Sequence, residues 1–288
     1  MGGLDKILMR IENKMNKDLL RKVQLVQLEI ACEIKRVCEE NQISFFLDAG
    51  TLIGAVRHQG FIPWDDDLDI GMLRKDYNRF VEIAPKALNE EYVWQSWTND
   101  EHYALPFGKV RKRNTLYLEE KTQHLQHNGF YVDVFPFDYA PVDEGERKKL
   151  LKKRMDLSRC ILIKENYKPW VENGKINWKK KAGYLWYQVI ASRYSKSALV
   201  QEYENAVAEV APSEWVYEQF GDSHIHYYRL EWLKETAKKI FENSEFPIPI
   251  GTDKFLREEY GDYMQLPPEE ERENRHGIVR VEFHYQEN

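Results

Sequence analysis

The sequence predicts an α/β fold of the α+β kind, with a mixed β-sheet in the first half of the chain and a mainly helical second half. Up to about residue 140, short apolar or alternating runs bounded by Gly, Pro and Asn are interspersed with helical patterns. From about Glu144 onward the spacing of apolar residues is mostly helical. The composition, 42% hydrophobic and 31% charged over 288 residues, is typical of a globular protein with a sizeable core.

The first half supplies the expected sheet. Residues 17–40 place apolar side chains at helical spacing, among them Val23, Ile30 and Val37, which predicts an amphipathic helix. A second helix is expected after Thr51, and a third over 74–84. The expected strands are short apolar or alternating runs. They lie at 45–48, 67–70, 92–97, 107–113, 115–120 and 129–138, the last of them ended by Pro136.

The second half is expected to contain three helices, at 144–165, 178–192 and 195–210. Pro and Gly residues return at 246–251 and 261–268, where they interrupt regular structure. We therefore expect a catalytic core with an N-terminal helix over 1–140 and a basic helical region over 141–245. Residues 246–288 are expected to pack back on the core.

Charge is distributed unevenly along the chain. The net charge of −6 combines −4 over residues 1–140, +9 over 141–200 and −11 over 201–288. The basic stretches 146–154 and 177–196 also carry Leu, Trp and Tyr, a mixture that suits an anionic membrane surface. The hypothesis is peripheral membrane contact through 146–196; the alternative is a solvated helical face balanced by the acidic C-terminal third. Nucleic acid is disfavoured, because the chain is acidic and carries no nucleic-acid motif.

Other features of the sequence exclude several classes of protein. The three cysteines show no C-x-x-C spacing, which argues against a disulfide scaffold and against a Cys-rich zinc site. No run of 18 apolar residues is present, and the N-terminus is charged from Asp5 onward without an apolar signal-peptide core. We therefore expect a cytoplasmic protein, with the inner face of the membrane as a further location.

Residues 46–70 carry the chemistry. Gly50 and Thr51 stand between a strand and a helix, where free N–H groups and a hydroxyl suit a phosphate. On a strand, Asp67 and Asp69 point to the same face, and two adjacent carboxylates repel unless a divalent cation lies between them. Asp133, a lone acid between two valines on a later strand, could complete such a site from a neighbouring strand.

The order of these pieces resembles the nucleotidyltransferase superfamily: a helix-opening Gly-Thr, an acid-x-acid strand and a later lone acid. The string GTLIGAVRHQGFIPWDDDLDIGM further resembles the LicD family, the bacterial phosphocholine transferases related to fukutin-type ribitol-phosphate transferases. Three other segments are similar to family segments: FGKVRKRNT (107–115), GFYVDVFPFD (129–138), and FPIPIG with FLREEYGDYMQLPP (246–268). The middle of the chain, about 145–230, carries no motif of that family.

This resemblance implies a nucleotidyltransferase-like mixed sheet with flanking helices, and a reaction that depends on Mg²⁺, with Mn²⁺ as an alternative ion. Phosphocholine would pass from CDP-choline to a sugar hydroxyl of lipopolysaccharide, teichoic acid or a similar lipid-linked glycan, and CMP would leave. Asp67, Asp69 and Asp133 would be the metal ligands and catalytic residues. Asp48, Asp65 and Asp66 would be carboxylates behind these ligands.

Cationic and aromatic residues provide candidates for binding the donor. Arg57, Lys109 and Arg111 are expected to bind the diphosphate together with Gly50 and Thr51. The alternatives are an ion pair with the Asp65–Asp69 acids for Arg57 and an exposed strand face for Lys109 and Arg111. A quaternary ammonium is recognised by aromatic faces. The candidates are Trp64, Trp94 or Trp97, Tyr103 and Tyr131, with packing in the core as the alternative.

Two other functions remain open at this stage. The same fold could use another CDP-alcohol, such as CDP-ribitol, CDP-glycerol or an ethanolamine donor, or it could transfer a nucleotidyl group, because the acids contact only the phosphates. A third interpretation is a non-catalytic choline- or glycan-binding module. The intact Asp67, Asp69 and Asp133 argue against this third interpretation.

Overall fold

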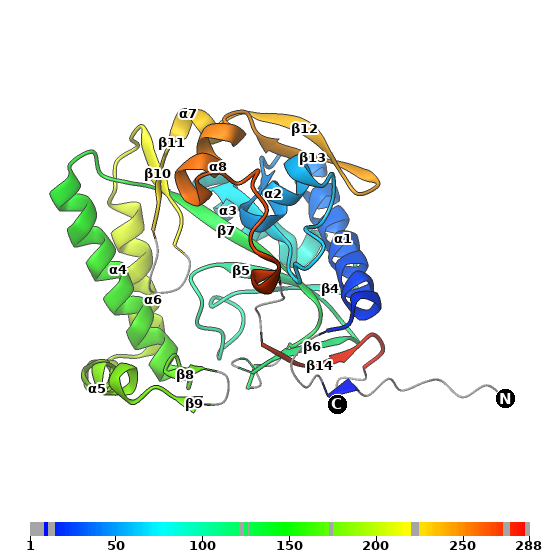
Figure 1. Cartoon of the computed structure of the whole chain (residues 1–288). Helices are drawn as coiled ribbons and strands as arrows, with labels where there is room; N and C mark the ends of the chain where they lie inside the picture. Colours follow the sequence, from blue (N-terminus) through cyan, green and yellow to red (C-terminus); the bar gives the residue numbers. More distant parts are fainter. Residues whose placement is uncertain are drawn as a thin grey trace.

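A seven-stranded mixed sheet forms the centre of the protein in the computed structural model (Figure 1). The model describes residues 9–10, 15–120, 122, 124–125, 127–172, 175–219, 225–272 and 277–285. Strand β7 (Tyr131–Tyr139) is the longest strand of the sheet and runs parallel to β3 (Asp69–Leu73). The other pairings are antiparallel. They involve β2 (Phe46–Leu47), β4 (Tyr92–Gln95), β5 (Gly108–Lys112), β10 (Trp215–Tyr217) and β11 (Tyr227–Arg229).

Strand β7 continues through Pro136, so the prediction that this proline ends the strand is wrong. The reason lies in how β7 pairs along its two edges. On one edge, β7 pairs with β3 along Asp133–Phe137. On the other edge, pairing with β5 stops at Val134 and pairing with β10 starts at Asp138. Pro136 falls between these two partners, and a residue without an N–H group is tolerated there because neither strand needs its hydrogen bond.

Helices α1 (Lys17–Glu40) and α3 (Arg74–Ala87) pack against the sheet. The side chain of Asn16 caps α1 by accepting a hydrogen bond from the Leu19 N–H at 2.8 Å. The apolar stripe predicted for this helix is buried, with Val23, Ile30 and Val37 fully shielded from solvent. Helix α2 (Ala49–Arg57) lies between β2 and β3 in the chain.

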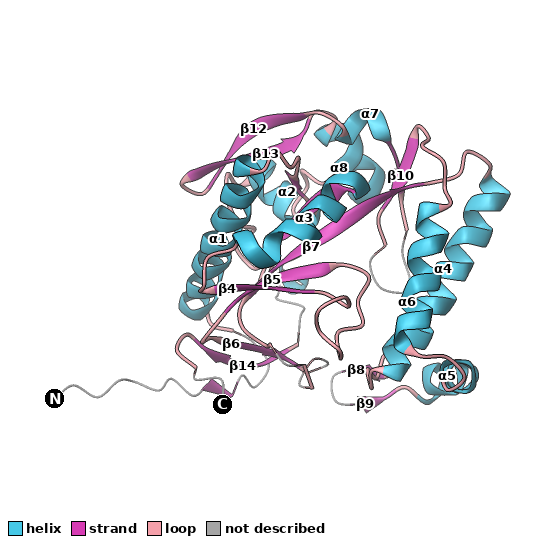
Figure 2. Ribbon diagram, turned by 180° about the vertical axis from the view of Figure 1, so that it is seen from behind, coloured by secondary structure: helices cyan, strands magenta, loops and turns pink. Residues whose placement is uncertain are grey.

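Three further helices build a second apolar core beside the sheet (Figure 2). They are α4 (Glu144–Lys164), α5 (Trp178–Ala191) and α6 (Lys196–Ala208), and α4 packs against both of the others. Their buried side chains, such as Ile161 and Leu199, meet Tyr103 and Ala104 from the loop between β4 and β5. The loop that leaves the sheet therefore joins the two cores.

The rest of the chain adds small elements around the sheet. Strands β12 (Thr236–Phe241) and β13 (Ser244–Pro249) form a hairpin, and helices α7 (Leu230–Leu233) and α8 (Thr252–Tyr260) flank it in sequence. A three-stranded sheet contains β1 (Met9–Arg10), β14 (Ile278–Glu282) and β6 (Leu116–Glu119). A short pair, β8 (Val171–Glu172) and β9 (Lys175–Ile176), precedes α5, and a 3₁₀ turn covers Glu269–Glu271.

The predicted α/β class is confirmed, and two details besides Pro136 need correction. The mainly helical second half was predicted too broadly, because residues 215–249 contain the strands β10 to β13. The strand predicted to start at Asp67 starts at Asp69. The three cysteines are free, as expected. Within the described ranges, none of the helices combines the length and apolar character that a membrane-spanning segment needs. Residues 1–8 and 11–14, part of the segment expected to lack a signal peptide, lie outside those ranges.

A buried ion network joins the helical unit to the sheet. Asp138, near the end of β7, accepts a hydrogen bond from Arg74 Nε at 2.5 Å and pairs with Arg154 Nη1 of α4 at 2.9 Å. Burial raises the pKa of Asp138, but the two guanidinium groups outweigh it and hold the pKa below its usual range. Tyr203 and Tyr217 contact the same Arg154. The carboxylate of Asp138 thus pairs with two buried cations, and Arg74 is also 3.6 Å from Glu204 Oε2.

We predict that Asp138→Ala destabilises the protein by about 3–5 kcal/mol, because Arg154 would keep a buried charge without a counter-ion. Urea unfolding, followed by far-UV circular dichroism, would measure this as a lower midpoint. The control is Glu144→Ala, which removes an exposed ion pair with Lys148 at the start of α4 and should leave the midpoint unchanged. Equal midpoints for the two variants would contradict the role given to Asp138.

Candidate functional site

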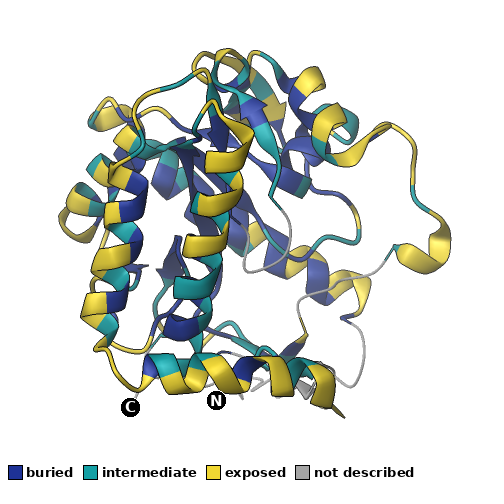
Figure 3. Cartoon of the chain, turned by 90° about the vertical axis from the view of Figure 1, so that its left-hand side faces the viewer, coloured by how far each residue is buried: buried dark blue, intermediate teal, exposed yellow. Residues whose placement is uncertain are grey.

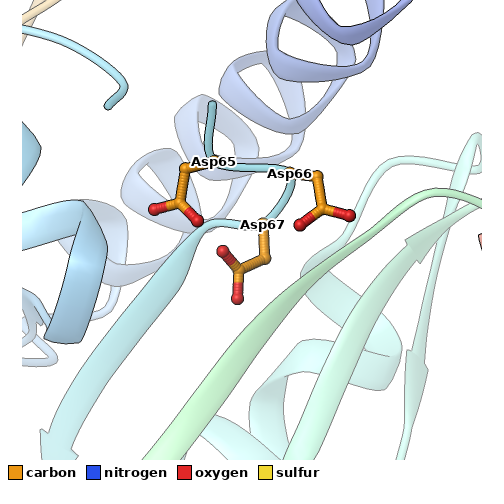
Figure 4. A group of neighbouring side chains, drawn as sticks. All are labelled: Asp65, Asp66 and Asp67. Carbon is orange, nitrogen blue, oxygen red and sulfur yellow. The ribbon is translucent and has the colours of Figure 1, made fainter. Parts of the chain in front are cut away.

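The acidic segment Asp65–Asp67 is held in place by buried polar side chains. Its carboxylate oxygens lie within 4.8 Å of one another (Figure 4). On α1, Gln24 Nε2 donates to the Asp65 carbonyl at 2.9 Å and Gln27 Nε2 donates to the Asp66 carbonyl at 2.8 Å. The hydroxyl of Tyr117 also donates to the Asp66 carbonyl, at 3.0 Å. The backbone is therefore fixed where three negative side chains converge.

Two further acids lie opposite each other on the neighbouring parallel strands. Asp69 of β3 is in register with Asp133 of β7, and the Asp133 N–H donates to the Leu68 carbonyl at 3.1 Å. Both side chains are buried. Burial raises the pKa of Asp69 well above its usual range, and the negative charges of Asp67 and Asp133 raise it further. The sequence-predicted trio thus occupies one region, with Asp67 just before β3 and grouped with Asp65 and Asp66.

The N-terminus of α2 is tied directly to this acid pair. Thr51 Oγ1 accepts a hydrogen bond from the Asp69 N–H at 2.9 Å, and the Asp48 N–H donates to the Asp69 carbonyl at 3.1 Å. A Cβ at Gly50 would lie 2.8 Å from Asp65 Oδ2, so the lack of a side chain at Gly50 lets that carboxylate approach the start of α2. Thr51 therefore positions Asp69, a role that the sequence did not indicate.

Lys109 is the cation that lies within the acid group. Its Nζ is 2.7 Å from Asp133 Oδ1, and β5 and β7 place the two residues in register. The ammonium also lies 3.5 Å from the centroid of the Tyr131 ring. Lys109 is 3% exposed, so the alternative of an exposed strand face is excluded for this residue.

The side chains of Arg111 and Arg57 form hydrogen bonds with residues outside the acid group. Arg111 is also buried, and its guanidinium donates to Gln95 Oε1 at 2.5 Å and to the Gly129 carbonyl at 2.8 Å. Arg57, the last residue of α2, donates to the Tyr263 carbonyl at 2.5 Å. Diphosphate binding by either residue stays a prediction. The hydrogen bonds that the two side chains form hold neighbouring segments of the chain in place.

A cavity of about 540 Å³ opens beside Asp65. Aromatic rings and carboxylates line it, together with Gly50 and Arg57. The rings are those of Trp64, Tyr260 and Tyr263, and the acids are Asp65, Asp262 and Glu271. The Arg272 guanidinium lies 5.4 Å from the Trp64 ring centroid, so one of the two faces of this ring already receives a cation.

The other aromatic candidates pack elsewhere. Trp94 is buried against Phe80, Tyr103 belongs to the second core, and Trp97 contacts Tyr203. Tyr131 is buried under Lys109. Among the aromatic residues named from the sequence, Trp64 alone lines the cavity, so the alternative of core packing holds for the rest.

A second group of acids, two of them buried, lies behind Asp69. Asp48 caps α2 and is fully buried; burial, followed by the charge of Glu259, raises its pKa to about 8. Glu218, after β10, is 3% exposed, and burial and Asp48 raise its pKa well above the usual range. The Tyr228 hydroxyl donates to Glu259 Oε2 at 2.6 Å. Glu218 lies in no recognisable motif, and only Glu259 falls in the string FLREEYGDYM.

The donor set of the site suits a hard divalent cation. Asp67, Asp69 and Asp133 offer carboxylate oxygens, the ligand type that Mg²⁺ and Mn²⁺ prefer, and no softer ligand occurs among them. Burial is the main cause of the raised pKa of Asp69, and repulsion from Asp67 and Asp133 adds to it; a cation between these acids would relieve that repulsion. In ligand type these acids therefore fit such an ion. Among the described residues, the three acids whose carboxylate oxygens lie within 4.8 Å of one another are Asp65, Asp66 and Asp67.

Comparisons with known proteins match the part of the chain that carries these acids. A family profile described as "LicD/FKTN/FKRP, nucleotidyltransferase domain" matches residues 42–172, the stretch that carries the acids and Lys109. The lipopolysaccharide cholinephosphotransferase LicD of Haemophilus influenzae is 30% identical over 270 residues, which cover 91% of this chain and 97% of that protein. The chain belongs to the LicD family.

Relatives outside the bacterial LicD proteins match shorter parts of the chain. The ribitol 5-phosphate transferases FKRP of mouse and human are 25% identical over 114 residues, which is 38% of this chain and 20% of those proteins. An uncharacterized protein of Rickettsia typhi is 53% identical over 47 residues, 16% of this chain and 15% of that protein. Similarity to the LicD protein thus extends over both the sheet and the helical unit.

We predict that Asp48→Asn stabilises the metal-free protein at alkaline pH. The pKa of Asp48 is about 8 in the folded protein and 3.8 in the ordinary side chain, so the folded state keeps a proton that the unfolded chain releases. Asp48 therefore lowers stability progressively as pH rises between these two values. Differential scanning fluorimetry in EDTA should find the Tm of the variant above wild type by at least about 2 °C at pH 9, with a clearly smaller difference at pH 5, where only the lower part of the interval between 3.8 and 8 has been crossed. The same difference at both pH values would contradict this prediction.

Proposed function

We propose that this protein transfers phosphocholine from CDP-choline to a sugar hydroxyl of a cell-surface glycan, with a divalent metal ion, and releases CMP. The acceptor we propose is a lipid-linked lipopolysaccharide, teichoic acid or similar glycan at the inner face of the membrane, approached through the basic segment 146–196. Family membership gives the reaction class, and the chain is accordingly a phosphotransferase.

The observation that carries the proposal is the register of Asp69 and Asp133 on adjacent parallel strands, beside the Asp65–Asp67 segment. Asp67, Asp69 and Asp133 would hold Mg²⁺ or Mn²⁺, which when bound neutralises the diphosphate and the charge that develops on the leaving CMP. Lys109 balances Asp133 within the protein and contributes positive charge toward the same phosphates.

The reaction balances without any other reagent. The acceptor oxygen forms a bond to the phosphorus of the phosphocholine group, and the bond from that phosphorus to the bridging oxygen breaks. The bridging oxygen and its electron pair leave with CMP, and a site carboxylate takes the proton of the acceptor hydroxyl. Thr51 and Asp48 contribute by fixing the backbone of Asp69.

The cavity beside Asp65 favours choline over the other alcohols. Choline presents methyl groups and a positive charge without a hydrogen-bond donor, so aromatic faces and nearby carboxylates attract it. Trp64, Tyr260 and Tyr263 supply the faces, and Asp65, Asp262 and Glu271 supply the negative charge. Ribitol or glycerol would instead need hydrogen-bond partners for several hydroxyl groups. A CDP-ribitol, CDP-glycerol or ethanolamine donor, nucleotidyl transfer and a non-catalytic module are the alternatives that the following experiments separate.

We predict that Asp69→Asn and Asp133→Asn each lower the rate of phosphocholine transfer at least about 10³-fold, because each removes a metal ligand and charge stabilisation. Release of CMP from CDP-choline, measured with added Mg²⁺ and a glycan acceptor, would quantify the loss, and EDTA should abolish the wild-type activity. Asn keeps the shape of Asp, so thermal unfolding should show a folded protein. A fully active Asp69→Asn/Asp133→Asn variant would exclude the metal mechanism. A wild-type protein that binds CDP-choline without releasing CMP would instead favour a binding module.

We predict that Trp64→Leu weakens CDP-choline binding about 2- to 30-fold, the range expected for loss of a cation–π contact of about 0.5–2 kcal/mol. Isothermal titration with CDP-choline, CDP-ribitol and CMP, each with Mg²⁺, would measure it. CDP-ribitol and CMP should bind the variant and wild type alike. Trp178→Leu, an exposed residue of α5, is the matched control. An equal loss for CMP would place the cytosine, not the choline, against Trp64.

A further inference from the structure

Helix α5 carries an apolar stripe on the side that faces solvent. Trp178, Leu185, Trp186 and Val189 are 68%, 55%, 67% and 49% exposed. Together with the exposed Ala182, they occupy positions i, i+4, i+7, i+8 and i+11 of the helix. At about 100° per residue, these five positions fall within an arc of about 100°, so they form one continuous stripe.

The opposite side of α5 makes the contacts with the protein. Tyr184 and Ala191 are buried, and Ala191 belongs to the second core with Ile161 of α4. The half-buried Tyr187 accepts from Arg159 and donates to Asp156 at 2.7 Å, both residues of α4. Figure 3, in which α5 lies across the bottom, shows the yellow of exposed residues along its outer side. The stripe is therefore additional to the packing of the helix.

Positive charge surrounds this stripe without acidic neighbours in sequence. Between Lys175 and Gln201 the chain has six basic residues and no Asp or Glu. The basic residues are Lys175, Lys179, Lys180, Lys181, Arg193 and Lys196. Lys181 Nζ lies 4.7 Å from the centroid of the Trp178 ring, so charge and aromatic surface are adjacent. Ile176, 43% exposed, extends the apolar surface toward β9.

The basic residues of α4 are arranged differently. Lys148 pairs with Glu144, Lys152 with Asp156 and Lys153 with Glu202, each at 2.6 Å. These pairs locally offset the positive charge of residues 146–154. Among the described residues, Lys175, Lys179 and Lys181 form no ion pair, so the positive charge around β9 and the first turn of α5 is less offset than that of α4.

We propose that the outer face of α5, with Lys175, Lys179 and Lys181, binds the surface of a membrane that contains anionic phospholipid. Tryptophan is favoured at the boundary between headgroups and acyl chains, Leu and Val enter the apolar layer, and lysines beside them meet anionic headgroups. A second copy of this chain fits less well, because two such faces would bring lysines of like charge together. The proposal is independent of the donor, and it places the enzyme at the surface where the proposed lipid-linked acceptor would lie.

Vesicle flotation of the full chain tests this proposal. Wild-type protein should float with vesicles of phosphatidylcholine and phosphatidylglycerol and float poorly with phosphatidylcholine alone. Added salt should reduce the floated fraction, because it screens attraction between lysines and headgroups. CMP release with a water-soluble glycan acceptor, measured in parallel without vesicles, reports the proposed function separately.

Two variants address the two components of the surface. Trp178→Ser/Leu185→Ser/Trp186→Ser removes the stripe, and Lys179→Glu/Lys181→Glu reverses the charge beside it. Each should lower the apparent affinity for the anionic vesicles at least about tenfold. Each should keep the wild-type thermal unfolding and the wild-type activity on a soluble acceptor, because all three apolar side chains point away from the core.

Matched controls separate location from composition. Ile240→Ser/Ile250→Ser removes apolar residues that are 54% and 61% exposed elsewhere, and Lys148→Glu/Lys152→Glu makes the same change in net charge on α4. Both should float like wild type. The proposal is overturned if the wild type does not bind anionic vesicles, or if the α5 variants float as well as these controls. It is also overturned if size-exclusion chromatography shows that the stripe variants only convert a dimer to a monomer.

Discussion

The constraint on which the site depends is the burial of Asp69 directly opposite Asp133. Two carboxylates on adjacent parallel strands repel each other, and burial strengthens this repulsion because water no longer screens the two charges. The surrounding structure counters it in two ways. Lys109 pairs with Asp133, while Thr51 and Asp48 hold the backbone of Asp69. Such an arrangement is weak as a source of stability and well suited to a divalent cation and a diphosphate, because both relieve the unfavourable charge.

Strand β7 links this site to the helical unit. Asp133 and Asp138 lie five residues apart on it, and since strand side chains alternate, they point to opposite faces of the sheet. One face carries the proposed chemistry and the other holds Arg74 and Arg154, which attach α3 and α4. Helix α4, and with it the helical unit, is thus positioned by the same strand that carries Asp133. This connection gives a physical reason why similarity to the LicD protein of Haemophilus influenzae extends over both parts.

The charge distribution is best understood as two surfaces with different tasks. The acids of 65–69 and their neighbours make a negative site that a metal ion would prepare for phosphates. The face of α5 is positive and apolar, and it suits anionic lipid. A cavity lined by Trp64, Tyr260, Tyr263 and acids, next to Asp65, adds a third environment that attracts a quaternary cation. The proposed metal and choline sites are negative and the proposed lipid-binding face is positive, so these charges of opposite sign partly cancel in the net charge of −6.

Local patterns in the sequence determined the fold class, most helix and strand positions, and the candidate acids Asp67, Asp69 and Asp133, because amphipathic periodicity and short motifs are local properties. The extent of β7 through Pro136 was decided by the tertiary structure, since it depends on where β5 and β10 stop pairing. Contacts between distant segments also decided that Thr51 supports Asp69, that Arg111 binds Gln95 and Gly129, and that Glu218 lies behind Asp48. The stripe on α5 was determined partly by the sequence and partly by the tertiary structure. Its spacing can be seen in the sequence, but the stripe is exposed because the opposite face of α5 packs against α4.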